Sequence, residues 1–148
     1  TVRVDLDPAP RSVTRQGALA GIAAGMLGGI PSTLHAAATG RSPLGGVRAA
    51  GNLLAPAHAP RWLLLALGPV AHVAVSAGWG VILAHALPRG REVTGGVAAG
   101  LGIAALDLGI VGRRLPLIRA LPQAPQVADH AAYGLVAGLI IRRYRRDA

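Results

Sequence analysis

Five ionisable side chains lie within or at the ends of long apolar tracts of this sequence, where such groups are rare. They are His35, His72, Asp107, Asp129 and His130. An ionisable group inside a membrane-spanning helix costs about 2.5 to 3.5 kcal/mol on insertion scales, so it normally faces a helix partner or a cavity and marks a functional site. We therefore take these five residues as the candidate polar site.

Three kinds of chemistry are open to this set. Asp107 and His72 could relay protons in a small proton-coupled transporter. Two histidines on different helices could ligate a b-type haem, and His35 and His130 with an aspartate could bind a metal ion. The sequence has no compact ligand motif, no cysteine and no phenylalanine to wall a haem pocket. We therefore expect no cofactor, with haem b or a metal ion as the alternatives.

Structural roles compete with each of these interpretations. Asp129 could N-cap the last apolar helix, which would leave His130 at the level of the lipid headgroups. His72 could be a hydrogen-bonded packing residue, and Asp107 could form a structural ion pair with a nearby arginine or histidine. The residue types and their spacing are compatible with both a working site and a structural one.

Motifs of soluble enzymes are absent from the sequence. It contains no GxSxG and no phosphate-binding loop, and its most glycine-rich string, GGVAAGLG, lies inside an apolar tract where it is typical of helix packing. The sequence therefore favours a non-enzymatic accessory or structural membrane component. The alternative is a small proton-coupled transporter, or a protein that binds haem or a metal through the polar site.

The elements that must position these residues are apolar helices. Apolar residues make up 52% of the chain, mainly as unbroken tracts of Ala, Gly, Val and Leu, which is the composition expected of segments that cross lipid. We predict an all-α integral membrane four-helix bundle with Gly/Ala-rich packing faces, in residues 17–142, between an N-terminal segment 1–16 and a basic tail 143–148. The predicted spans are 17–38, 62–87, 94–112 and a short fourth span, 127–141.

Arginine supplies all fifteen positive charges and indicates the orientation. With four spans, nine arginines flank the side that holds both termini and six flank the other side, so the positive-inside rule favours cytoplasmic termini. The arginines are not gathered with stacking aromatics on one face, so nucleic acid is not an expected partner. A competing interpretation treats the first span, which ends in Ala36, Ala37 and Ala38, as a cleaved secretory signal.

Glycines recur at four-residue intervals in three of the predicted spans, which places them on one face of each helix. Small residues on such a face let helix backbones approach closely in lipid. We expect more such faces than one bundle needs, which favours a homo-oligomer or a larger membrane complex, with lipid as the surrounding partner. The stripe residues are Gly17, Gly21, Gly25, Gly29, Gly96, Gly100, Gly134 and Gly138.

Proline and serine mark structure outside the regular spans. Pro31 removes a backbone donor near the end of the first span. Ser42 followed by Pro43 predicts the start of a short helix in the first outer loop. The second outer loop, 113–126, contains three prolines, so we predict at most one short helix there, between Pro116 and Pro122.

Four strings together resemble a known type of protein: PSTLHA, AHVAVSAGWG, ALDLGIVGRRLP and LPQAPQVADHAAYG. They are similar to strings of small uncharacterised four-span membrane proteins predicted from actinobacterial genomes, over about residues 17 to 142. The resemblance implies a bacterial inner-membrane setting and assigns no catalytic residue.

Overall fold

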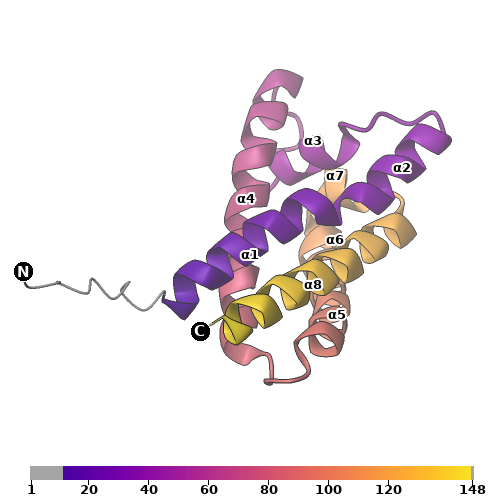
Figure 1. The fold of residues 1–148 in the computed structure, drawn as a ribbon. Helices are drawn as coiled ribbons and strands as arrows, with labels where there is room; N and C mark the ends of the chain where they lie inside the picture. The colour runs from indigo at the N-terminus through magenta and orange to yellow at the C-terminus, as the bar shows by residue number, and fades with distance from the viewer. Residues whose placement is uncertain (1–11, 148) are drawn as a thin grey trace, which may run out of the picture.

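The computed structural model describes residues 12–147, and every regular element in this part of the chain is helical (Figure 1). The prediction of an all-helical fold is therefore confirmed. Most of the predicted N-terminal segment 1–16 lies outside the described residues. The elements are α1 (Val13–Gly28), α2 (Ile30–Ala38), α3 (Gly45–Gly51), α4 (Arg61–Ala86), α5 (Glu92–Leu106), the π-helical turn η1 (Asp107–Val111), α6 (Gly112–Arg114), α7 (Pro116–Arg119) and α8 (Gln123–Arg146).

Three helical segments are long and apolar enough to cross a membrane. They are Val13–Ala38, which joins α1 and α2, Arg61–Ala86, which is α4, and Glu92–Arg114, which runs from α5 through η1 to α6. The predicted fourth span is not among these three. Its helix, α8, has 24 residues and is longer at both ends than the predicted 127–141. Its added ends are polar, and they lower its mean hydropathy.

The long helices pack in the order α4, α1, α8, α5. Helix α1 contacts both α4 and α8, and α5 packs mainly on the other side of α8. In Figure 1, α1 and α8 run side by side in front of α4 and α5. The consecutive helices α4 and α5 share little contact within residues 12–147, so a space remains between them.

Glycines hold α1 against α4 at very short range. A Cβ added to Gly17 would lie 2.7 Å from the Ala84 side chain, and one added to Gly21 would overlap the Ser76 carbonyl oxygen and lie 2.8 Å from Gly80 Cα. Gly25 meets the Ser76 side chain in the same way. These contacts need glycine because any larger residue would force the two backbones apart.

A second set of glycines joins α5 to α8. A Cβ on Gly96 would overlap the Gly134 carbonyl oxygen, and one on Gly100 would overlap the carbonyl oxygen of His130. Gly138 lies against the carbonyl oxygen of Glu92. Gly29, by contrast, meets no heavy atom within 4 Å, so assigning it to the packing stripe of the first span was wrong. The chain breaks there.

The break between α1 and α2 has a local cause. Pro31 has no N–H to donate back to Leu27, and the Gly29 N–H is directed to the Leu27 carbonyl. Helix α2 then starts at Ile30, with Pro31 in its first turn. Its first N–H groups therefore have no partner within the helix.

Both outer loops contain the short helices expected there. The first begins later than the predicted start at Ser42 and Pro43, because α3 starts at Gly45 with Leu44 at its N-cap. The Ser42 hydroxyl accepts a hydrogen bond from the Leu44 N–H at 3.3 Å in the turn before it. Helix α3 packs on α4, where Gly51 lies against Leu64 and Gly68 against Val47. Helix α7 occupies the stretch between Pro116 and Pro122. The space between α4 and α5 is therefore covered at one end by α3 and α7.

Candidate functional site

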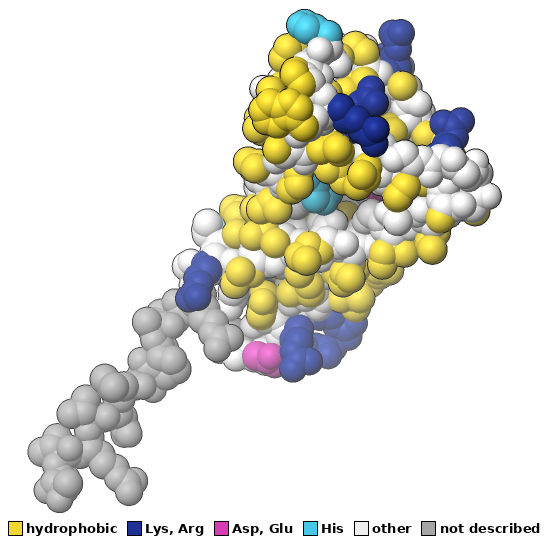
Figure 2. All heavy atoms as spheres, turned by 90° about the horizontal axis from the view of Figure 1, so that it is seen from above, with side chains coloured by type: hydrophobic (Ala, Val, Ile, Leu, Met, Phe, Trp, Pro, Cys, Tyr) yellow, Lys and Arg dark blue, Asp and Glu magenta, His cyan; other side chains and the backbone are white. Residues whose placement is uncertain are grey.

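A cavity of about 910 Å³ fills the space between α4 and η1, and we call it the central cavity. Most of its lining is apolar and comes from α1 to α4, α7 and α8. Figure 2 shows a largely apolar face with one histidine side chain near its middle and another at the end of the molecule. Four of the five candidate polar residues line this cavity: His72, Asp107, Asp129 and His130.

His72 reaches from α4 to the end of α1. Its Nε2 lies 3.0 Å from the carbonyl oxygen of Gly25. A carbonyl can only accept a hydrogen bond, so Nε2 carries the proton and, in the neutral ring, Nδ1 is left as an acceptor. The Gly25 carbonyl is open to this bond because the Gly29 N–H turns to Leu27 at the helix break. The break thus creates the acceptor that positions His72.

Asp129 caps a helix other than its own. Its Oδ1 accepts a hydrogen bond from the Ser32 N–H at 2.8 Å, and Ser32 is in the first turn of α2. Helix α8 begins at Gln123, six residues before Asp129, so the interpretation of Asp129 as the N-cap of its own helix is wrong. The carboxylate instead satisfies a donor exposed by the break near Pro31, and a negative charge is favoured at a helix N-terminus.

Asp107 and His130 face each other from η1 and α8. The Oδ2 atom of Asp107 lies 3.4 Å from Nε2 of His130, and Nδ1 of His130 lies 2.7 Å from the carbonyl oxygen of Gln126. Because Nδ1 must donate to that carbonyl, the neutral ring would turn a lone pair toward the carboxylate. The pair therefore needs one more proton, carried either on Nε2 or on Asp107. Asp107 opens a π-helical turn, a feature frequent at functional sites.

The proposed relay between Asp107 and His72 is not a contact of this structure. His72 bonds to Gly25, and the ionisable partner of Asp107 is His130. Among residues 12–147, no three His, Asp or Glu side chains lie together in a way that could hold a metal ion.

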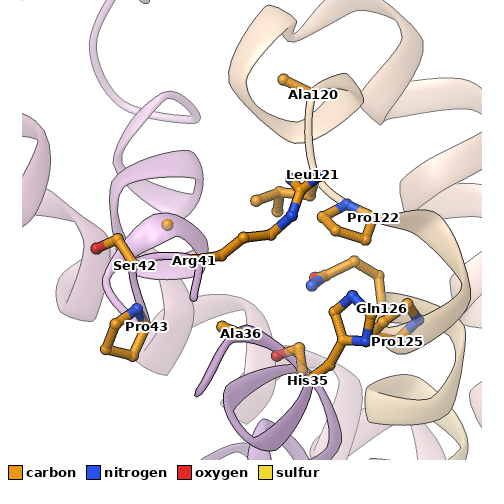
Figure 3. A pocket seen from close by; sticks show the side chains of 13 residues that line it. His35, Ala36, Arg41, Ser42, Pro43, Ala120, Leu121, Pro122, Pro125 and Gln126 are labelled. Carbon is orange, nitrogen blue, oxygen red and sulfur yellow. The ribbon is translucent and has the colours of Figure 1, made fainter. Parts of the chain in front are cut away.

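His35 lies apart from the other four candidates. It lines a separate pocket of about 280 Å³ between α2 and the segment that leads into α8. Figure 3 shows Arg41 extending toward Leu121 and Pro122 in this pocket, with Gln126 on the side of α8. The prediction that His35 shares one site with the other four residues is wrong. Gln126 lines both spaces, so the pocket is a neighbour of the central cavity.

Tyr133 is a cavity residue that the sequence analysis missed. Its hydroxyl donates a hydrogen bond to the Ser76 carbonyl oxygen at 2.6 Å, and its side chain is buried. It also packs on Gly28. The bond ties α8 to α4 past the end of α1. The available signal was that Tyr133 stands one residue before Gly134, in the middle of an apolar tract.

A second missed cluster lies at the opposite end of the bundle. The Arg145 guanidinium donates to Glu92 Oε1 at 2.9 Å, to the Leu87 carbonyl oxygen at 3.0 Å and to the Ala84 carbonyl oxygen at 2.9 Å. Glu92 is only 4% exposed. This arginine joins the end of α4, the start of α5 and the end of α8. Its role is structural, and it closes the bundle far from the central cavity.

No family model, curated protein or solved structure matches this chain. The functional argument therefore rests on the central cavity and on the groups that line it.

Proposed function

We propose that this chain is a non-enzymatic integral membrane component that holds a small amphipathic molecule in its central cavity. The three membrane-length apolar segments support the membrane setting. Large apolar side chains outside the cavity lining support it as well, since Ile82 is 51% exposed and Ile110 is 62% exposed. In this proposal the setting is a bacterial inner membrane and both termini are cytoplasmic.

Helix α8 is the fourth membrane-crossing helix in this proposal. Its 24 residues extend about 36 Å at 1.5 Å per residue, enough for about 30 Å of hydrocarbon. Its arginines stand at one end, where their stems reach the interface. Asp129 and His130 face the cavity between helices, which is where ionisable groups are tolerated within a membrane.

The single observation that carries the proposal is the size and lining of the central cavity. Its volume of about 910 Å³ falls in the range of small-molecule sites, and a few polar groups converge on its otherwise apolar wall. The space is partly open along one side, because Met26, Leu34 and His72 in its lining are exposed. A ligand could therefore enter it from the surrounding lipid.

Two hydroxyl groups that line the cavity support a role without catalysis. Ser32 and Thr33 both donate their hydroxyl protons to the carbonyl oxygen of Gly29, at 3.3 and 2.8 Å. An activated nucleophile needs a base within hydrogen-bond reach. These hydroxyls are directed to a backbone acceptor instead.

Filling the cavity tests the proposal. A Cβ added at Gly29, which lines the cavity, or at Gly78, which does not, would meet no heavy atom within 4 Å, so both positions have room for the start of a larger side chain. Native mass spectrometry of protein released from its own membranes should detect one bound molecule per chain in the wild type and in Gly78→Leu. The Gly29→Leu variant should lose it. Absence of a bound molecule from the wild type, or equal retention in both variants, would refute the proposal.

Proton-coupled transport is a second candidate, favoured by the single proton that Asp107 and His130 must share. Proteoliposomes with an imposed pH gradient would show proton-driven uptake of the bound molecule that Asp107→Asn abolishes. If the wild type binds the molecule but shows no proton-driven uptake, the protein is a binding component and not a transporter.

Assembly with further copies or with another membrane protein is a third candidate. The glycine stripes pack helices of the same chain against each other, so most of them do not supply the spare contact faces that favoured an oligomer in the sequence analysis. Gly78 on α4 and Gly102 on α5 still face open space and could admit another helix. Blue-native electrophoresis of the solubilised protein would test this, and a strictly monomeric species would count against it.

A further inference from the structure

The carboxylates of this protein are distributed unevenly relative to its arginines. The chain has a formal net charge of +9, and the described residues contain four acidic side chains. Glu92 pairs with Arg145, and Asp147 lies 3.8 Å from Arg143. The other two carboxylates both line the central cavity, and none of the residues that line it in the described part of the chain is an arginine. The central cavity of this arginine-rich chain is therefore lined by two carboxylates and no arginine.

Four hydrogen-bond donors at the polar end of the cavity are already directed to protein acceptors. The donating nitrogens of His72 and His130 point to the carbonyl oxygens of Gly25 and Gln126, and the Tyr133 hydroxyl points to that of Ser76. The Ser32 N–H is held by Asp129. The charged groups that remain for a ligand are the two carboxylates, which are acceptors, while the Gln126 amide and the Ser76 hydroxyl add only uncharged donors.

The formal charge at this end is negative. Counted with uncharged histidines, as in the formal net charge, this end carries the carboxylates of Asp107 and Asp129 and, among the described residues, neither lysine nor arginine. A proton on His130 beside Asp107 would cancel one of these two charges and leave that of Asp129. An anionic headgroup would find neither an arginine nor a charged donor to bind it. An ammonium group would supply both the missing positive charge and the donors, since charge-assisted hydrogen bonds to carboxylates are the strong ones.

We infer that the central cavity binds a lipophilic amine, with its ammonium group at Asp107 and Asp129 and its apolar tail along the cavity wall. The inference rests on the proposed binding function and names the class of ligand. The tail has an apolar path because α4 and α5 do not close against each other. Trp79 also lines the cavity on α4 and offers an aromatic face to a cation.

Trp79 also supplies a direct reporter of binding. The chain has two tryptophans, and the other, Trp62, is 70% exposed and outside the cavity lining. In a Trp62→Phe background, all tryptophan fluorescence comes from Trp79, and a bromoalkyl chain in contact with Trp79 quenches it. The probes are 12-bromododecylamine, 12-bromododecanol and 12-bromododecanoic acid, added to protein in phosphatidylcholine nanodiscs.

We expect the amine to quench Trp79 at a concentration about tenfold lower than the alcohol, with the acid weakest, because one charge-assisted hydrogen bond is worth about a factor of ten or more in affinity. Asp129→Asn keeps an oxygen for the Ser32 N–H and removes the charge, so it should remove most of the preference for the amine. Asp147→Asn, at an exposed site away from the cavity, should leave the preference unchanged.

Equal quenching by amine and alcohol, or stronger quenching by the acid, would overturn the inference while leaving a binding cavity in place. An unchanged amine preference in both Asp129→Asn and Asp107→Asn would also overturn it. If none of the three probes quenches Trp79, the proposed binding function itself fails. The three probes are compared on protein in which both aspartates are intact. This comparison therefore tests the inference even if an aspartate variant does not fold.

Discussion

Two glycines on α4, two residues apart, should respond in opposite ways to the same substitution. A Cβ added to Gly80 would lie 2.5 Å from Gly21 Cα and 2.6 Å from Gly21 N. Gly78 faces open space, with no heavy atom within 4 Å of its added Cβ. Because both positions are on one helix, comparing Gly80→Ala with Gly78→Ala separates helix contact from helix propensity.

The expected magnitude follows from these distances. Ordinary contact of a Cβ begins near 3.4 Å, and the Gly17 carbonyl oxygen lies even closer to this Cβ than Gly21 does, so Gly80→Ala must push α1 and α4 apart by at least about 0.9 Å. The full attraction of one atom pair is about 0.1 to 0.2 kcal/mol, and a gap of roughly 0.5 to 1 Å loses a quarter to a half of it. Gly17 and Gly21 both meet the backbone of α4, so the loss is spread along the helix pair. We expect a total cost of about 1 to 3 kcal/mol, as for other overpacked sites.

The assay is unfolding of the protein in mixed micelles by increasing SDS, followed by far-ultraviolet circular dichroism. Gly80→Ala should lower the free energy of unfolding by the amount given above. Gly78→Ala should leave it unchanged or raise it by up to about 1 kcal/mol, since alanine is the better helix former. If the two variants agree within about 0.5 kcal/mol, then the close approach of α1 and α4 is not what holds this bundle together.

Three further changes test the polar contacts between helices. Tyr133→Phe removes one buried hydrogen bond to the α4 backbone and should lower the free energy of unfolding by about 0.5 to 1.5 kcal/mol in the same assay. Arg145→Gln should shift the SDS midpoint well below that of Arg143→Gln, because the Arg143 ion pair is exposed and Arg145 joins three helix ends; equal midpoints would contradict this. Asp129→Ala should speed amide hydrogen exchange at Ser32, and Asp129→Asn should restore protection, because only the asparagine keeps an oxygen for that N–H.

The break in the first span shows where sequence reasoning failed. The sequence analysis grouped His35 with four other polar residues in one candidate site. The structure has a helix break at Gly29, and His35, which follows the break, lines the neighbouring pocket. Pro31 indicated a missing backbone hydrogen bond, but the sequence did not indicate that the Ser32 N–H exposed by the break would be bound by Asp129, which is 97 residues away.

Helix α8 extends beyond the span predicted for it. Periodic apolar residues end near Ile141, so the predicted span ended there. The structure continues it to Arg146. Arg145 in this last turn finds Glu92 and two free carbonyl groups at the end of α4. The sequence analysis counted Arg145 as one of nine arginines that indicate the membrane orientation. It could not predict that Glu92 is the partner of Arg145.

Local patterns in the sequence were enough to determine the helical fold and the three membrane-length segments, and they singled out four of the polar residues that line the cavity. Apolar length and four-residue spacing are properties of one helix at a time, and they are readable without knowledge of any neighbour. Only the tertiary structure decided which partner each polar group takes: His72 with Gly25, His130 with Asp107, and Tyr133 with Ser76. Such pairings depend on the relative position and tilt of separate helices, which are set by backbone contacts between residues far apart in the chain.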